Sequence, residues 1–410
     1  MEGRGSSRRA SVALRLALLS LGLPVAVVVV ATQTDSVTGL LDLRIYLGAS
    51  ASLRSGGSIY AFSDPTYGLG STYPPLWALL LWPVSGANVH VVEYVWTTVG
   101  VVLWLVTLEL LATPVACRPF RGPNPLPGTG VCLVWLATLF SAPVWNTLNQ
   151  GQINVALWLL LVIDLRLVLR GRAAAGVAAG TAAALKLWPL MAVVLYAGAR
   201  RWRAATLATL TFVLLTAASA LVVPDDARRF WTELVGDTGR VGGLGDPQSS
   251  SLRSVLERTG LPAALGTATW AVLAVVVVVL AVAAFRRALQ QRAIITAATV
   301  LGCAAALVSP ISWTHHLVFL CFPRLLVLPA PGARPCVARG ALAVGLVVAL
   351  VDPVGWGRLA VTSDLRALAM VVLLGAAPWL AAVEAGHAAV SPRSDVPDVP
   401  GTPDGSPTPS

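Results

Sequence analysis

Charge is what this sequence has least of. Only 12% of its 410 residues are Asp, Glu, Lys or Arg, against about 25% in an ordinary soluble domain. Hydrophobic residues make up 56% of the chain, and the mean hydropathy is +0.76. So few charges exclude a soluble enzyme of this size, and so much apolar surface excludes disorder outside the ends. The composition therefore indicates an integral membrane protein with many helices.

Lysine is nearly absent as well, since Lys186 is the only one and every other basic residue is arginine. The 29 basic residues exceed the 19 acidic ones, which gives a net charge of +10. In a soluble protein this excess would suggest nucleic-acid binding, but in a membrane protein it is typical of cytoplasmic loops. We therefore expect a membrane-lipid environment and no nucleic-acid partner.

Cysteine is scarce too, and none of the five cysteines stands in a CxxC or in a histidine-containing metal spacing. All five lie in or beside apolar runs, so we expect small buried side chains. We expect no metal, no cofactor and no disulfide framework.

Clusters of arginine divide the apolar runs into hairpins. If every cluster lies in the cytoplasm, each stretch between two clusters crosses the membrane and returns. The clusters are Arg118/Arg121, Arg166/Arg170/Arg172, Arg200/Arg201/Arg203, Arg286/Arg287/Arg292 and Arg334/Arg339. The polar turns of the hairpins then meet on the extracytoplasmic face, and they are Asn146–Asn154, Lys186–Pro189, Pro224–Gly260, Ser309–His316 and Asp352–Arg358.

The pattern predicts an all-α polytopic membrane protein of about 10–12 transmembrane helices with an external first loop. We expect a cytoplasmic N-terminus at 1–11, a transmembrane domain at 12–385 and a disordered cytoplasmic tail at 386–410. The expected external loops are 32–72 and 224–260.

The first loop is expected to contain a short helix at the membrane interface. Helical spacing places five residues on one of its faces, namely Leu43, Tyr46, Leu47, Ser50 and Leu53. After the loop, residues 73–113 must cross the membrane once, so we expect a bent entry at Pro74 and Pro75 followed by one full span.

Two charged residues are candidates for chemistry. Asp42 follows the first apolar run, where a carboxylate can act as a general base on a hydroxyl if its surroundings tune it. Pairing with Arg44 or helix capping is the structural alternative. Lys186 lies inside an apolar run near the helix-breaking Pro189, where a positive charge suits a phosphate. Snorkelling to the interface is its structural alternative.

Amides, histidines and one tyrosine complete the candidates. The segment from Asn149 to Asn154 carries four amides, including Gln152, which would be costly in hydrocarbon but are suited to sugar hydroxyls. Tyr73 has an aromatic face of the kind that stacks on sugar rings. His315 and His316 can donate to a phosphate or tune a base, and a structural role for either has equal weight.

Six motifs occur in a recognisable order: Asp42-Leu-Arg-Ile-Tyr, Thr72-Tyr-Pro-Pro, Gly151-Gln-Ile-Asn, Lys186 followed by Pro189, Gln248-Ser-Ser-Ser-Leu-Arg, and Ser309-Pro-Ile-Ser-Trp-Thr-His-His. From about residue 12 to 330, this set resembles glycosyltransferase family 87, the polyprenol-phosphate-mannose-dependent α-mannosyltransferases of the GT-C superfamily. In the fifth motif the family often has Asn-Gln, whereas this chain has Gln248-Ser249.

The resemblance implies a GT-C-type bundle in the plasma membrane with its active site on the extracytoplasmic face. It implies inverting, metal-free transfer of mannose from polyprenyl-phosphate-mannose to an envelope glycolipid or lipoglycan. Asp42 would be the catalytic base, and Tyr46 and Arg253 would bind the acceptor. The donor phosphate and sugar would be bound by Lys186, His315, His316, Tyr73, Gln152 and Asn154.

Two alternatives stay open from the residues alone. A GT-C enzyme could use another polyprenyl-phosphate sugar, such as arabinose or glucose. A flippase or proton-coupled transporter for lipid-linked sugars could use Glu93, Glu109 and Lys186. Asp164, by contrast, is explained by pairing with Arg166 two residues later.

Overall fold

The computed structural model describes residues 39–116, 138–323 and 360–389, together with Pro24 and Val28. The predicted first span, the arginines at 118, 121, 334 and 339, the turn Asp352–Arg358 and residues 390–410 of the tail lie outside this part. Within it, every regular element is a helix, and one isolated β-bridge joins Ser63 to Gly70. The predicted all-α class is therefore confirmed.

Four of the described helices are long and apolar enough to cross a membrane: α5 (Val89–Ala116), α11 (Trp202–Val222), α14 (Ala263–Gln290) and α18 (Ala360–Ala389). A fifth candidate is the pair α7 (Ala142–Gln150) and α8 (Asn154–Leu169), which meet at an angle of 119°. These helices confirm a polytopic membrane protein. The total of 10–12 spans includes segments outside the described residues and stays a prediction.

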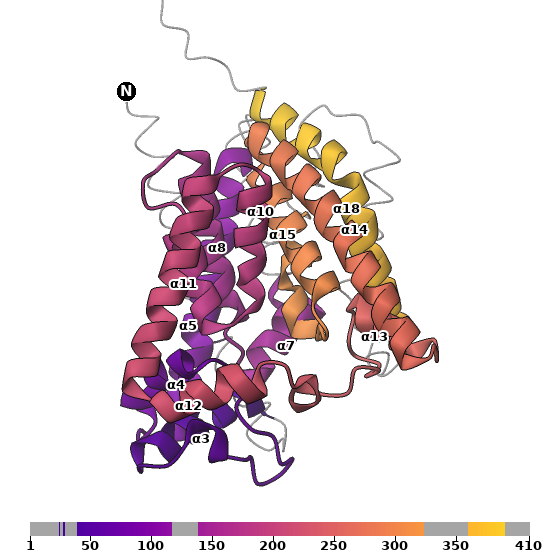
Figure 1. The fold of residues 1–410 in the computed structure, drawn as a ribbon. Coiled ribbons are helices and arrows are strands. Elements are labelled where there is room, and N and C mark those ends of the chain that lie inside the picture. The colour runs from indigo at the N-terminus through magenta and orange to yellow at the C-terminus, as the bar shows by residue number, and fades with distance from the viewer. Residues whose placement is uncertain (1–23, 25–27, 29–38, 117–137, 324–359, 390–410) are drawn as a thin grey trace, which may run out of the picture.

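Shorter apolar helices fill the space between the long ones. They are α9 (Val177–Leu185), α10 (Met191–Gly198), which follows the 3₁₀ turn η3 (Trp188–Leu190), and α15 (Ile294–Val308). In Figure 1 the long helices lie side by side, and α3 (Leu41–Arg54), α4 (Pro75–Leu81), α12 (Pro224–Arg229) and α13 (Leu252–Arg258) gather at one end.

The described arginine clusters occupy turns at the other end of the bundle. Residues 166–172 form the end of α8 and the turn after it, residues 200–203 the turn after α10 and the start of α11, and residues 286–292 the end of α14 and the turn before α15. The chain therefore separates its arginine-rich turns from its polar turns along the helix axes. This is the arrangement that the arginine pattern predicts.

Helix α3 is the short helix expected in the first loop. Leu43, Tyr46, Leu47 and Ser50 are buried on one face, and Leu53 is half-buried, as the spacing predicts. The Ser50 hydroxyl donates to the backbone oxygen of Ala78 at 3.0 Å, which fastens α3 to α4.

The bent entry after the first loop is also present. Pro75 occupies the first turn of α4, where the missing N–H of proline costs no hydrogen bond. The short helix η2 (Trp82–Val84) and a turn follow, and α5 then runs without interruption from Val89. One bent entry and one long helix therefore account for residues 73–113.

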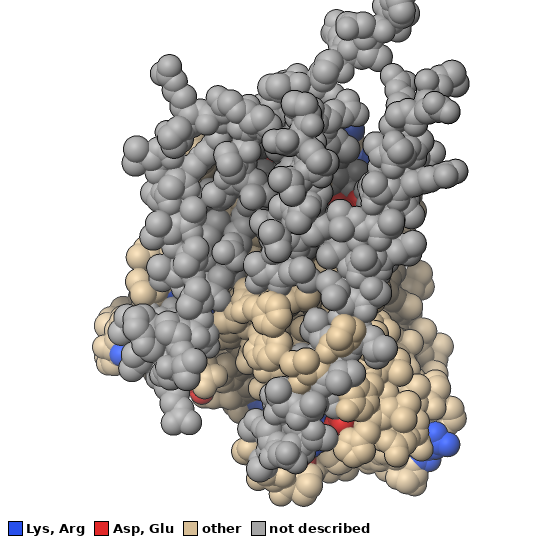
Figure 2. All heavy atoms as spheres, turned by 180° about the vertical axis from the view of Figure 1, so that it is seen from behind, with Lys and Arg blue, Asp and Glu red and all other residues tan. Residues whose placement is uncertain are grey.

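The outward faces of α11 and α14 are apolar, with Leu214 67% and Val272 64% exposed. On the face shown in Figure 2, most of the described surface belongs to uncharged residues, with a few Lys, Arg, Asp and Glu side chains among them. Such faces are suited to contact with lipid rather than water.

Asp164 does not pair with Arg166, so that expectation is wrong. The Asp164 carboxylate accepts hydrogen bonds from the backbone N–H groups of Gly176 and Ala178 at the start of α9, and from the Tyr196 hydroxyl at 2.7 Å. The Arg166 guanidinium instead donates to the backbone oxygen of Leu110. The carboxylate satisfies N–H groups that a helix start leaves without partners.

Candidate functional site

A cavity of about 310 Å³ opens among the polar turns. Its lining comes from α3, the end of the first loop, the α7–α8 turn, the break after α9, the loop after α12 and the segment after α15. Seven of the site candidates are among its lining residues: Asp42, Tyr46, Tyr73, Gln152, Lys186, His315 and His316. The predicted convergence of the turns on one end is therefore confirmed for the described turns.

Gln152 connects the candidate base to the candidate phosphate ligand. Its Nε2 donates to Asp42 Oδ2 at 2.6 Å, and its Oε1 accepts from Lys186 Nζ at 3.0 Å. The same Oε1 accepts from the Tyr73 hydroxyl at 2.7 Å, and the Tyr46 hydroxyl donates to that of Tyr73 at 2.8 Å. Because Oε1 meets two donors, the amide is held with its N–H facing the carboxylate.

The surroundings of Asp42 fit a general base. Burial raises the pKa of its carboxyl above the ordinary value, whereas the Gln152 hydrogen bond and the charge of Lys186 lower that pKa. Neither structural alternative is present, because Arg44 pairs with Glu93 at 2.9 Å and Asp42 makes no cap bond at the start of α3. A carboxylate held in this way can accept a proton from a bound hydroxyl.

Lys186 lies at a break in the helical path. It leaves α9 with extended backbone angles, φ −153° and ψ 138°, and Pro189 stands in the 3₁₀ turn that follows. Its Nζ donates to Gln152 and to Asn154 Oδ1, the latter at 3.3 Å, and lies 4.8 Å from the centre of the Tyr73 ring. The ammonium therefore turns into the cavity and does not snorkel to the interface.

The two histidines are held in different ways. The backbone N–H of Trp313 donates to His316 Nδ1 at 3.2 Å, so the neutral ring carries its proton on Nε2. His315 Nδ1 lies 3.2 Å from Asn146 Oδ1, and its buried Nε2 has no partner within the described residues. His316 can thus donate from Nε2, while His315 can accept at Nε2.

Burial and the nearby charge of Lys186 lower the pKa of both imidazoles, which favours their neutral forms. The rings stand perpendicular, with centroids 4.5 Å apart. Both histidines line the cavity, and their rings face different directions.

Two predicted site residues stand apart from the cavity lining. Arg253 of α13 donates to Thr267 Oγ1 at 2.7 Å and lies 3.8 Å from a Glu257 carboxylate oxygen, and the structure does not bring it to the cavity. Asn154 lies behind the lining, where it bonds Lys186 and donates to the backbone oxygen of His315 at 2.9 Å. Asn154 thus connects the lysine to the histidine segment.

Sequence reasoning missed the residues that fasten the two segments predicted as external loops to each other. The Asp226 carboxylate accepts from the Ser58 hydroxyl and from Ile59 N, the latter at 2.9 Å. Arg240 lines the cavity and donates to the backbone oxygen of Ser71. These partners are more than 160 residues apart in the chain, so local spacing carries no signal for them.

Glu93, one of the residues named for the transporter alternative, and the possible metal ligands can be located in the structure. Glu93 is buried between Arg44 and His90, at 2.9 and 3.1 Å. The described residues contain no group of three or more His, Cys, Asp or Glu able to hold a metal ion, and metal independence stays a prediction. Cys303 and Cys321 are buried, as their apolar surroundings predict.

Gly151 fixes the distance between α3 and the α7–α8 turn. Its φ is +67°, and a Cβ added there would lie 2.5 Å from the Cβ of Leu43, one residue after Asp42. On the α3 side, Leu40 N donates to Asn149 O at 2.8 Å. The turn therefore approaches the base-bearing helix too closely for any side chain.

We expect Gly151→Ala to lower transfer activity about tenfold, because α3 must move and take Asp42 with it. Gly171→Ala is the matched control, since Gly171 has a similar φ of +63° and no atom within 4 Å of an added Cβ. Both variants carry the left-handed backbone cost of about 1–2 kcal/mol. Equal activities for the two, measured on purified protein of known melting temperature, would show that the contact with Leu43 is unimportant.

The fold and the cavity together define the class of protein: a polytopic membrane protein in which a carboxylate and a cation at the cavity are joined through one amide. The family model of glycosyltransferase family 87 matches residues 72–310. That segment contains Tyr73, Gln152 and Lys186, and it is flanked by Asp42 on one side and the histidines on the other.

Three curated relatives extend the comparison. The chain is 32% identical over 342 residues to a polyprenol-phosphate-mannose-dependent alpha-(1-2)-phosphatidylinositol pentamannoside mannosyltransferase of Mycobacterium tuberculosis, covering 80% of this chain and 76% of that protein. It is 30% identical to a protein of the same description from Mycolicibacterium smegmatis, covering 74% and 72%. It is 28% identical to a phosphatidylinositol mannoside mannosyltransferase of the same dependence and linkage from M. tuberculosis, covering 72% and 71%.

The chain therefore belongs to glycosyltransferase family 87 and is an enzyme of the α-mannosyltransferase class.

Proposed function

We propose that this enzyme transfers mannose from polyprenyl-phosphate-mannose to a hydroxyl of a phosphatidylinositol mannoside. We place the reaction on the extracytoplasmic face of the plasma membrane, with inversion at the anomeric carbon. The names of the relatives support the donor and the acceptor class. The single observation that carries the mechanism is the pair of hydrogen bonds that joins Asp42 to Lys186 through Gln152 at the cavity.

The transfer uses the two groups that Gln152 joins, the Asp42 carboxylate and the Lys186 ammonium. The acceptor oxygen attacks the anomeric carbon while the Asp42 carboxylate takes the hydroxyl proton. The bond between the sugar and the phosphate oxygen breaks, and its electron pair leaves with the polyprenyl phosphate. Lys186 offsets the charge that develops on the phosphate as the sugar passes through an oxocarbenium-like state. A single displacement inverts the centre, so an α-linked product requires a β-linked donor.

The two histidines then have separate tasks. His316 donates from Nε2 to a phosphate oxygen, because its Nδ1 is occupied by Trp313 N. His315 offers a buried lone pair at Nε2, which suits a sugar hydroxyl and repels a phosphate oxygen. Neutral imidazoles perform both tasks without a change of charge.

The decisive test is transfer by the purified protein in detergent. Labelled polyprenyl-phosphate mannose, arabinose and glucose are offered in separate reactions with phosphatidylinositol mannosides, and the new anomeric linkage is read by NMR. We expect an α-mannoside from the first donor alone. Transfer from another donor would replace mannose as the substrate. If no donor supports transfer, and the protein moves a lipid-linked sugar across the membrane of sealed vesicles, the flippase alternative is favoured.

The membrane side is tested with a cysteine placed at Asp225, which is exposed on α12 beside the second external loop. We expect a membrane-impermeant thiol reagent to label Asp225→Cys in intact cells. Labelling only after lysis would place this end of the bundle in the cytoplasm.

A further inference from the structure

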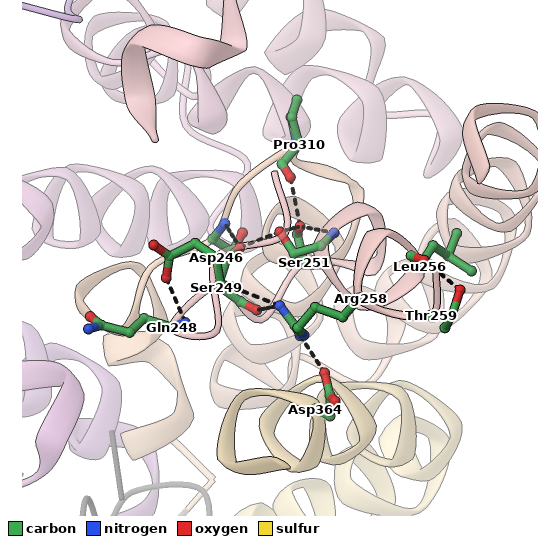
Figure 3. Close-up of polar contacts among 11 residues, drawn as sticks. Asp246, Gln248, Ser249, Ser251, Leu256, Arg258, Thr259, Pro310 and Asp364 are labelled. Atoms are coloured by element: carbon green, nitrogen blue, oxygen red, sulfur yellow. Dashed lines mark hydrogen bonds and ion pairs between the residues drawn. The ribbon is translucent and has the colours of Figure 1, made fainter. Parts of the chain in front are cut away.

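The motif Gln248-Ser-Ser-Ser-Leu-Arg is buried where its serines stand, although the sequence predicts a polar external loop. Ser249, Ser250 and Ser251 are all 0% exposed. A buried hydroxyl costs free energy unless it is hydrogen-bonded. In Figure 3 the motif lies between Pro310 and the helix that carries Asp364, which is α18.

The serines hold the chain immediately before the two histidines. Ser312 N donates to Ser249 Oγ at 3.0 Å, and Ser250 N donates to Ser312 O at 2.8 Å. Ser251 Oγ donates to Pro310 O at 2.8 Å. We call these three groups, the hydroxyls of Ser249 and Ser251 and the backbone N–H of Ser250, the serine template.

Helix α18 fixes both partners of this contact. Arg258 donates to the backbone oxygens of Asp246 and Ser249, at 2.8 and 3.0 Å, and forms an ion pair with Asp364 of α18 (Figure 3). Two residues further along α18, the buried Arg366 donates to Thr314 Oγ1 at 3.0 Å. The template and the segment that it holds are thus both bound to α18.

A short path leads from the template to His316. Both backbone polar groups of Ser312 are bound, so the peptide that follows it has a fixed orientation. That peptide carries the Trp313 N–H, which donates to His316 Nδ1, while His316 N donates back to Trp313 O at 2.9 Å. The orientation of the His316 ring is therefore fixed by Trp313, the residue that follows Ser312.

We propose that the serine template positions His316 for glycosyl transfer by fixing Ser312 and, through it, the Trp313 N–H. The template holds the His316 tautomer that carries its proton on Nε2, toward the cavity. Ser249 and Ser251 are positioning residues through their hydroxyls, whereas Ser250 contributes only its backbone N–H, and none of the three lines the cavity. The inference rests on the proposed function, because it assigns the donor phosphate to His316.

The chain supplies a matched pair of variants. Ser249→Ala removes the acceptor of Ser312 N and leaves that buried N–H without a partner. Ser250→Ala removes a buried hydroxyl that has no hydrogen-bond partner within the described residues, and it keeps the backbone N–H of the template. We expect Ser249→Ala to lower kcat/KM for the donor about tenfold, with KM for the acceptor unchanged. We expect Ser250→Ala to match the wild type.

A double-mutant cycle separates positioning from general stability. In a His316→Ala background there is no ring left to position, so Ser249→Ala should have almost no further effect on kcat/KM. Two independent losses that multiply would instead show that Ser249 acts only through the fold. Equal activities of Ser249→Ala and Ser250→Ala in the wild-type background would also overturn the proposal.

A second pair covers the case in which Ser249→Ala does not accumulate. Ser251→Thr keeps the hydroxyl that bonds Pro310, and Ser251→Val has the same shape without it. We expect the threonine variant to be the more active of the two, and equal activity would overturn the proposal. Wild-type transfer is measured alongside: its absence contradicts the proposed function, whereas an active wild type with indifferent serine variants contradicts only the positioning role.

Discussion

Replacing Asp42 by asparagine is expected to lower kcat for mannosyl transfer about 1,000-fold, within the range that a general base contributes. The substitution keeps the shape of the side chain, and the amide oxygen can still accept from Gln152 Nε2. It removes the negative charge and, with it, the ability to take a proton from the acceptor hydroxyl. The measurement is the initial rate with labelled donor in detergent, at saturating concentrations of both substrates.

The control for this variant is Asp225→Asn, which changes the same group on the exposed surface of α12. Both proteins should purify in wild-type amounts with similar melting temperatures. A near-normal rate for Asp42→Asn would remove Asp42 from the role of base and turn attention to His315, whose buried Nε2 has no hydrogen-bond partner within the described residues.

Replacing Lys186 by methionine is expected to weaken donor binding by up to about 100-fold, the loss typical of a hydrogen bond to a charged group. Methionine retains the length and apolar stem of lysine, so the packing against Tyr73 survives. KM for the donor should rise while KM for the acceptor stays near the wild-type value. An unchanged KM for the donor would exclude phosphate binding by Lys186.

The same variant should move the pH profile in a defined direction. Asp42 acts as a base only when ionised, so activity falls as the pH drops through its pKa. The Lys186 charge lowers that pKa, and its removal should shift the acid limb of kcat/KM to higher pH. Lys186→Arg, which keeps the charge, should shift the limb less. A limb that stays in place or moves to lower pH would show that the lysine does not act on Asp42.

Much of the fold could be predicted because its signals are local. The helical spacing of Leu43, Tyr46 and Ser50 predicted the buried face of α3, and the two prolines predicted the bent entry before α5. The arginine clusters predicted which turns gather, because charge sorts loops by membrane side. Helix α18 continues to Ala389, past residue 385, where the transmembrane domain is predicted to end, and that boundary stays a prediction.

The site was predicted as a set of residues but not as a set of contacts. Asp42, Gln152 and Lys186 stood out because polar groups are rare in this chain, yet nothing local showed that one amide joins them. Arg44 lies two residues from Asp42 and binds Glu93, 49 residues away. The serines looked external because the loop around them is polar, and their burial depends on Pro310 and Ser312, about 60 residues later.

The link from Asp42 through Gln152 to Lys186 has a kinetic consequence. In the empty cavity the ammonium and the carboxylate offset each other, so the base is restrained while no donor is present. A polyprenyl phosphate beside Lys186 brings a competing negative charge and weakens the hold of the ammonium on Asp42. The carboxylate then becomes more basic after the donor arrives. Activation of the acceptor hydroxyl by Asp42 should accordingly depend on the donor being bound.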